Sequence, residues 1–225
     1  MNKFLIIFSN QIKILYHHPK SFFSNILFFI CFVTIFLIVL SPLQIASEGI
    51  LSNNKNSQTL LIGASFFAIL ACLLASTQDF LREDFADGTL EQMIINCENF
   101  EVFIIAKIFA NWLNSCFVAV IFSTIIGALL GYQDDFLWQF FVIFLLTSFL
   151  INCICSLCGS LAILGGATSL IAFIALPLIL PVILFGCLGI YENFDLNLKI
   201  LIALNIFLNP ILCLASSSIA KIALD

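Results

Sequence analysis

The stretch FLWQFFVIFLLTSFLINCICSL, residues 136–157, decides the fold class of this chain. None of its residues is Asp, Glu, Lys or Arg. At a rise of about 1.5 Å per residue, a helix of this length crosses the roughly 30 Å hydrocarbon core of a bilayer. The stretch lacks the regular alternation of polar and apolar residues that a membrane β-strand shows. It therefore predicts a membrane-spanning α-helix.

Similar apolar runs recur along the whole chain. Hydrophobic residues make up 62% of it and charged residues 9%, and its mean hydropathy is +1.18. Soluble domains carry about 25% charged residues, so this composition excludes a soluble globular protein. We expect an all-α integral membrane protein, with residues 1–225 forming a single membrane domain. The six expected spans cover residues 22–40, 60–76, 103–130, 136–157, 170–190 and 200–220.

The distribution of basic residues predicts the orientation, because cytoplasmic loops carry an excess of Lys and Arg. With the amino terminus inside, two basic residues, Lys55 and Lys199, lie outside. The other six then lie inside: Lys3, Lys13, Lys20, Arg82, Lys107 and Lys221. Both termini, and the connection between the second and third spans, are therefore expected in the cytoplasm.

Residues 2–20 have the pattern of an amphipathic helix. Basic and polar residues fall on one face and apolar residues largely on the other. Pro19 disfavours helical geometry at His18 and marks a boundary before the first span. Such a helix lies in the membrane interface. The alternative is an extended end of the first span.

The segment QDFLREDFADGTLEQM, residues 78–93, concentrates acidic residues in an otherwise almost uncharged chain. Its carboxylates belong to Asp79, Glu83, Asp84, Asp87 and Glu91. Asp87-Gly88 favours a tight turn. Thr89 followed by Gln92 three residues later is a capping-box pattern, which predicts a short helix starting there. Its apolar residues are Leu90, Met93, Ile94 and Ile95.

Three interpretations of this acidic segment compete. A metal or catalytic site needs convergent ligands, usually with histidine, and the only histidines are the distant His17 and His18. A solvated loop does not explain apolar residues on a short capped helix. A docking element for a partner protein explains both the apolar residues and the charge. The predicted docking residues are Asp84, Asp87, Gly88, Thr89, Leu90, Glu91, Gln92, Met93 and Ile94.

Several residues inside the spans have more than one interpretation. Pro177 and Pro181 kink the fifth span, either as a hinge or as a static bend. Gly127 and Gly131 form a G-x-x-x-G pattern that favours helix packing, within the protein or between copies, but is also compatible with a plain helix end.

Polar and sulfur-containing residues in the spans also have competing interpretations. Cys153, Cys155 and Cys158 superficially suggest a metal site, but the chain has nine cysteines, mostly in apolar runs, where they act as small hydrophobic residues. Asn111, Asn114 and Asn152 favour hydrogen bonds between helices, with a functional interior as the alternative.

Three segments together carry a resemblance to a known family. These are FLREDFADGTLEQM at residues 80–93, AKIFANWL at 106–113 and LPLILPVILFG at 176–186. In this order the chain resembles the CcmB family, the permeases of the cytochrome c maturation ABC transporter, which are similar to ABC-2 exporters. The resemblance implies a cytoplasmic coupling helix between spans two and three that contacts an ATPase subunit. The matching positions are Asp84, Asp87, Gly88, Leu90, Glu91, Gln92, Ala106, Lys107 and Trp112.

Two segments depart from the family pattern. Asn96-Cys97-Glu98 stands where the family usually has a proline-containing stretch. Gly159–Thr168, expected to be the second cytoplasmic loop, has no Lys or Arg where the family commonly has a basic residue.

The resemblance implies a membrane subunit that is not itself an enzyme. No G-x-x-x-x-G-K-[ST] phosphate loop occurs in the sequence, so ATP is expected on a separate CcmA-like subunit. Haem is the implied handled ligand, with no cofactor held by this chain and no nucleic acid. Further implied partners are CcmC-, CcmD- and CcmE-like proteins, the lipid bilayer and a second copy in a homodimer.

The implied location is the bacterial inner membrane, or the mitochondrial one if the chain is organellar. Because no haem ligand pair lies in the spans, a coupling role is favoured over a haem conduit. Two alternatives remain open: an ABC-2 exporter of a lipid, glycan or drug, and a secondary transporter.

Overall fold

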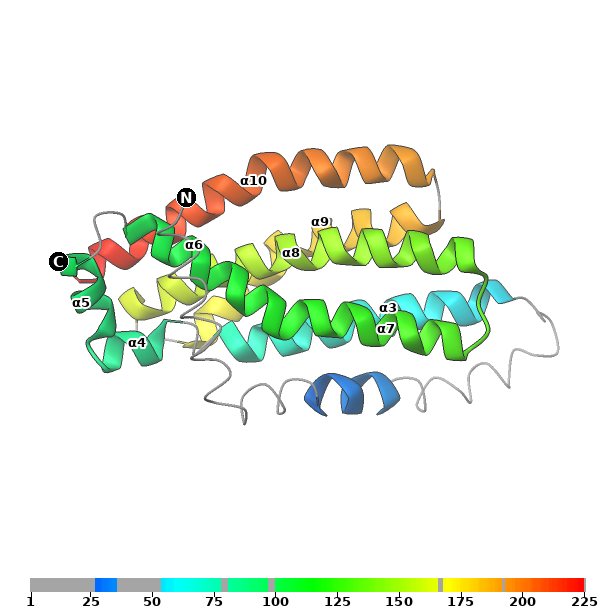
Figure 1. Ribbon diagram of the computed structural model, residues 1–225, viewed down its shortest axis with the longest axis horizontal. Helices are drawn as coiled ribbons and strands as arrows, with labels where there is room; N and C mark the ends of the chain where they lie inside the picture. Colours follow the sequence, from blue (N-terminus) through cyan, green and yellow to red (C-terminus); the bar gives the residue numbers. More distant parts are fainter. Residues whose placement is uncertain are drawn as a thin grey trace.

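The computed structural model describes residues 27–35, 54–77, 81–96, 100–165, 168–191 and 193–224. All regular structure in these residues is helical, as expected from the apolar runs. The long helices lie side by side in an elongated bundle, and the short helices α4 and α5 lie at one end of it (Figure 1). The predicted amphipathic helix at 2–20 and both histidines lie outside the described residues.

Within the described residues, nine helical segments follow the helix at residues 27–35. They are α3 (Asn54–Thr77), α4 (Arg82–Ala86), α5 (Thr89–Asn96), α6 (Phe100–Asn111), the π-helix η1 (Trp112–Phe117), α7 (Val118–Leu129), α8 (Asp134–Gly165), α9 (Thr168–Tyr191) and α10 (Phe194–Ile222). The segments α6, η1 and α7 follow one another without a break and form one long rod (Figure 1).

Four helices within the described residues are long and apolar enough to cross a membrane. They cover Gln58–Ala75, Phe100–Leu129, Asp134–Leu164 and Phe194–Ile222. A shorter apolar helix covers Ile174–Ile190, within α9. The prediction of an all-α membrane protein is therefore confirmed, and the described part of the expected first span is helical at 27–35.

Two expected connections are shorter than predicted, because helices continue past the apolar runs. The helix α8 ends at Gly165, so most of the loop expected at Gly159–Thr168 is helical. Ser160 lies inside the bundle and forms a hydrogen bond with Ser216 of α10, which holds this part of α8 against its neighbour. At the other end of the bundle, Asn193 adopts a left-handed conformation with φ of 45°, and α10 begins directly after it rather than at residue 200.

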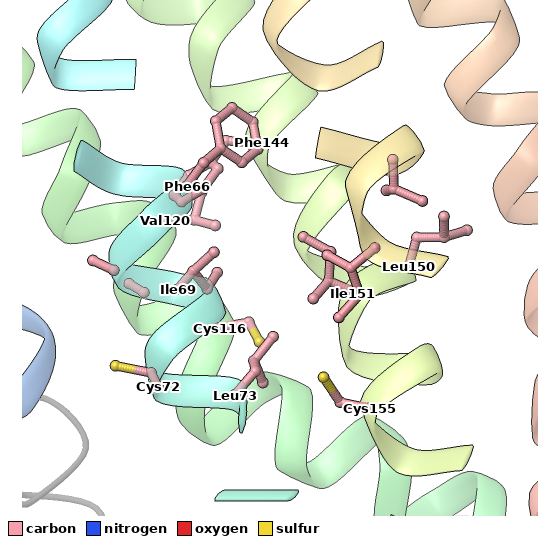
Figure 2. Packing of buried hydrophobic residues seen from close by; sticks show 14 of the residues in the cluster. Phe66, Ile69, Cys72, Leu73, Cys116, Val120, Phe144, Leu150, Ile151 and Cys155 are labelled. Atoms are coloured by element: carbon pink, nitrogen blue, oxygen red, sulfur yellow. The ribbon is translucent and has the colours of Figure 1, made fainter. Parts of the chain in front are cut away.

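The helix α8 is the centre of the bundle. Of its membrane-spanning part, 67% is buried within the protein, against 22% for α10, so α8 is the core helix and α10 a peripheral one. The rings of Phe66 and Phe144 meet edge to face, with centroids 5.0 Å apart, where α3 packs on α8. Figure 2 shows side chains of α3, η1, α7 and α8 converging in this core.

The two glycines of the G-x-x-x-G pattern have different roles. Gly127 is buried, and a Cβ atom there would lie 2.8 Å from Leu137 Cδ2 and 3.2 Å from Leu61 Cδ2. It therefore permits close packing within the chain. Gly131 has φ of +76° and ends α7: the N–H of Tyr132 donates to the Gly127 carbonyl at 3.3 Å, and that of Gly131 to the Ala128 carbonyl at 3.0 Å. This is a Schellman motif, in which glycine avoids the strain of a left-handed residue.

Pro177 and Pro181 lie within α9, which continues as a helix past both of them. Both side chains are exposed on the surface of the described bundle. A hinge at these residues remains a prediction.

Candidate functional site

The predicted docking segment folds as two short helices, α4 and α5, joined by a tight turn. Gly88 adopts φ of +70°, a conformation that favours glycine, and its N–H donates to the carbonyl of Phe85 at 3.3 Å. The sequence Asp87-Gly88 thus produces the turn it predicts. We call residues 81–96 the docking element.

The start of α5 is at the predicted residue, but its cap differs from the predicted one. The N–H of Gln92 donates to the carbonyl of Gly88 at 3.2 Å, which makes Gly88 the N-cap residue. The hydroxyl of Thr89 donates to the backbone carbonyl of Asp84 at 2.9 Å. This bond joins the two short helices across the turn.

An ion pair ties the docking element to the third span. The ammonium group of Lys107 in α6 donates to the carboxylate of Asp84. The side chains are 16% and 26% exposed, so the pair is shielded from water on most sides. Both residues belong to the motifs that carry the family resemblance, but their pairing was not predicted, because it joins positions 23 residues apart across a turn.

Leu90 is fully buried within the chain. It belongs to a hydrophobic cluster with members from several helices: Leu81, Phe100, Phe103, Ile104, Ile108, Cys153, Cys213 and Ala220. Met93 and Ile94 are half-buried and pack against the same cluster. The expectation that Leu90 is turned outward for a partner is therefore wrong, because residues of α6, α8 and α10 surround it within the chain.

A different set of side chains faces outward from the docking element. Asp87, Glu91 and Gln92 are exposed. Ile95 is 81% exposed and Phe85 41% exposed, although both are large apolar residues. Two exposed apolar residues thus lie among exposed polar and acidic ones on α4, the turn and α5. We call Phe85, Asp87, Glu91, Gln92 and Ile95 the outer face.

Comparison with known proteins identifies the family. Residues 2–223 match the family model described as CcmB protein. The chain belongs to the CcmB family.

Two curated relatives cover most of this CcmB-family chain. It is 25% identical over 195 residues to heme exporter protein B of Haemophilus influenzae, covering 86% of this chain and 83% of the relative. It is 26% identical over 186 residues to heme exporter protein B of Pseudomonas aeruginosa, covering 82% of this chain and 79% of the relative.

Cys153, Cys155 and Cys158 of this CcmB-family chain lie in two different hydrophobic clusters. Cys153 lies in the cluster beneath Leu90, whereas Cys155 and Cys158 lie in the main core of the bundle. Among the described residues, no group of three or more His, Cys, Asp or Glu side chains is arranged to hold a metal ion. The three cysteines of the C-x-C-x-x-C pattern therefore lie on different faces of α8.

Asn111 of the third span contacts α8. The amide of Asn111 donates to Asn152 Oδ1 at 2.9 Å, and the amide of Asn152 donates to the backbone carbonyl of Ile108 at 3.0 Å. The indole N–H of Trp112 donates to the Ser148 hydroxyl at 3.2 Å. The bonds of Asn111 and Asn152 are of the kind that the sequence favours, whereas the Trp112 bond was not predicted, and all three gather at the junction of α6 and η1.

Proposed function

We propose that this chain is the permease subunit of an ABC transporter that handles haem in cytochrome c maturation. Membership of the CcmB family and similarity to two heme exporter B proteins over most of the chain support this proposal. Because the chain has no phosphate-binding loop, a separate ATPase subunit binds and hydrolyses ATP. The coupled step is haem export or release of a haem-loaded periplasmic chaperone.

The proposed topology has six spans, with both termini and the docking element in the cytoplasm of a bacterium and the spans in its inner membrane. The docking element lies at the same end of the bundle as the last turn of α10 (Figure 1). The ammonium group of Lys221 in that turn lies 3.4 Å from the Glu101 carboxylate at the start of α6. Three basic residues, Arg82, Lys107 and Lys221, therefore gather at this end, which supports a cytoplasmic placement.

The outer face of the docking element is the proposed contact for the ATPase, and α5 is the proposed coupling helix. The observation that carries this assignment is the 81% exposure of Ile95 on a helix whose opposite face is fixed to the bundle by Leu90. Exposed apolar residues surrounded by polar ones are typical of protein contacts. Because Asp87 and Glu91 are acidic, we expect basic residues on the ATPase around its apolar contact.

Movement of the docked ATPase passes to the membrane helices through two connections. The buried Leu90 belongs to one hydrophobic cluster with Phe103, Ile104 and Ile108 of α6. The ion pair between Lys107 and Asp84 joins the same helix to the turn. A displacement of the docking element therefore displaces α6.

The proposed role towards haem is coupling rather than conduction. The only two histidines of the chain, His17 and His18, precede the spans in the sequence. Haem is handled together with CcmC-, CcmD- and CcmE-like partners, and the permease acts alone or as a homodimer. The names of the two relatives favour haem over a lipid, glycan or drug as the substrate.

Co-purification of the candidate ATPase with variants of the outer face tests the docking assignment. Ile95→Asp and Glu91→Lys are expected to reduce the amount of bound ATPase, with the Glu91 effect decreasing as salt is raised. Leu129→Asp is a matched control, because Leu129 is 82% exposed and lies at the opposite end of the bundle. Equal ATPase binding by all three variants and the wild type would show that the outer face is not the docking surface.

A further inference from the structure

The third span is divided between two hydrophobic clusters. Phe103, Ile104 and Ile108 of α6 belong to the cluster that holds Leu90 of the docking element. Trp112 and Cys116 of η1, followed by residues of α7, belong to the main core of the bundle. Figure 2 shows Cys116 and Val120 among core residues of α3 and α8. The boundary between the clusters in this span falls where the π-helix begins.

The π-helix is the one change of winding in this otherwise α-helical rod. Trp112–Phe117 has π winding, with α-helix directly before and after it. A π segment contains a wider turn than an α-helix, is rare, and is frequent at functional positions. At its start the regular spacing of backbone donors and acceptors changes, which is costly where no water can compensate.

Asn152 of α8 contacts the rod at this change of winding. Its amide donates to the Ile108 carbonyl at 3.0 Å, and its Oδ1 accepts from Asn111 at 2.9 Å. The side chain of Asn152 is fully buried. The Asn152 side chain thus pairs with both the Ile108 carbonyl and the Asn111 amide, which lie just before Trp112. These two bonds connect the end of α6 to the central helix α8.

The two ends of the rod are fixed to different parts of the molecule. The ion pair between Lys107 and Asp84 fixes α6 to the docking element. Gly127 lets α7 pack closely against Leu61 and Leu137 of the bundle. A displacement of α6 relative to α7 must therefore change the segment between these two contacts. The π-helix lies in this segment, and it can convert to a second regular form, the α-helix.

We propose that Trp112–Phe117 takes up the movement of α6 relative to α7 by converting between π and α winding, and that Asn152 is the positioning residue that holds the π form. This inference rests on the proposed function, because docking of the ATPase is the source of the movement. Conversion between two hydrogen-bonded windings keeps the backbone groups paired within the membrane, whereas local unfolding does not. The rewinding shifts and rotates α6 against α7 without a break in the span.

Spin labels on the two sides of the π-helix test this proposal directly. Ile105 in α6 and Ile121 in α7 are each 37% exposed and suit unnatural amino-acid labels, which avoid the nine native cysteines. In the isolated wild-type chain and in Asn152→Leu, the 105–121 distance is expected to differ by about 1.5 Å, the rise of one residue, or more. A pair at Ile121 and Leu129, both in α7, is the control and is expected to stay constant. Equal 105–121 distances in the two proteins would overturn the proposal.

Variants in the complete complex supply a second test. Deleting Ser115 removes one residue from the wide turn, so that the span can be α-helical throughout. The residues of α6 and α7 then still present the same faces to the bundle. This variant is expected to bind the ATPase as the wild type does, but to lower ATP-dependent haem delivery about tenfold or more, the effect of roughly 1.4 kcal/mol on a rate-limiting step. Asn205→Leu is the control, because the Asn205 amide donates to Leu201 of its own helix at 2.8 Å.

The proposed function and the proposed rewinding of the π-helix can be overturned separately. Failure of the wild-type chain to bind any ATPase would overturn the proposed function but leave the label distances as a test of the rewinding. Normal haem delivery by the Ser115 deletion, in a complex that retains its ATPase, would overturn the rewinding alone. Misfolding of the deletion variant would count against it too, because a continuous α-helix is expected to fit the same faces.

Discussion

The ammonium group of Lys107 pairs with the carboxylate of Asp84, and this contact joins the membrane-spanning part of the chain to its docking element. Lys107 lies in α6, and Asp84 lies in α4, before the turn at Gly88. The same turn is closed by the Thr89 hydroxyl on the Asp84 carbonyl, so Asp84 is held through both its side chain and its backbone. A helix pair this short has little stability alone, and its position depends on such contacts with the bundle.

Removing one charge of this pair is expected to destabilise the docking element. Lys107→Met leaves the partly buried Asp84 carboxylate without its ammonium partner, at a cost of about 1–3 kcal/mol, between the values for surface and buried pairs. Thermal unfolding in detergent measures the loss. The control is Glu101→Gln, since the Glu101–Lys221 pair is about half exposed, with side chains 51% and 46% accessible. That variant is expected to change stability by about 0.5 kcal/mol or less.

The reversed pair Lys107→Asp with Asp84→Lys is expected to recover part of the stability that either single substitution removes. Each single substitution places two like charges together, whereas the double variant restores opposite charges. A double variant no more stable than the single ones would show that the pair adds nothing to the position of the docking element.

Leu90→Ala is expected to cost about 2–5 kcal/mol, the range for truncating a fully buried leucine. Leu90 is 0% exposed and sits in the cluster that joins α5 to α6. Ile95→Ala, on the same helix but 81% exposed, is expected to change the free energy of unfolding by about 0.5 kcal/mol or less. Denaturant unfolding of both variants separates the structural face of α5 from its outer face. Similar losses for both would contradict the burial of Leu90.

The sequence predicts the class of fold and the local form of the docking element, because both follow from local patterns. Charge-free runs predict membrane helices, and Asp87-Gly88 predicts the turn. The direction in which Leu90 points depends on tertiary packing. An amphipathic helix has an apolar face whether α6 or another protein covers it. The sequence alone does not distinguish these cases, and the prediction chose the wrong one.

The π-helix and the ends of the long helices could likewise not be predicted from the sequence. Trp112–Phe117 contains Asn114 and Ser115 among apolar residues, a composition that is equally compatible with an ordinary α-helix. The hydrogen bonds from Asn111 and Asn152 that accompany it join residues 41 and 44 positions apart. The end of α8 at Gly165 depends on its packing against α10, whereas the predicted end at residue 157 followed from bilayer thickness. Packing partners distant in the sequence decide each of these features.

Three glycine-to-alanine substitutions are expected to have different effects on stability. Gly63→Ala lies on an exposed face of α3 with open space around it and is expected to stabilise the chain by about 0.5–1 kcal/mol through helix propensity. Gly131→Ala forces a left-handed conformation on alanine and is expected to cost about 1–2 kcal/mol. Gly127→Ala places a methyl group 2.8 Å from Leu137 Cδ2 and costs about 1–3 kcal/mol unless that side chain moves. Melting temperatures measured in one detergent test this order, and a stable Gly131→Ala protein would contradict the Schellman motif.

The hydrogen bond between Trp112 and Ser148 is expected to contribute a measurable coupling energy at the start of the π-helix. Both side chains are buried, and the indole nitrogen lies 3.2 Å from the hydroxyl oxygen. Trp112→Phe and Ser148→Ala each remove one partner, and a double-mutant cycle isolates their interaction. Hydrogen bonds between membrane helices average about 0.6 kcal/mol and reach about 1.7 kcal/mol, so a coupling within this range is expected. Ser156→Ala in place of Ser148→Ala is the control, because the Ser156 hydroxyl donates to the Asn152 carbonyl of its own helix. A coupling near zero for Trp112 and Ser148, equal to that of the control pair, would show that this bond does not fix the π-helix to α8.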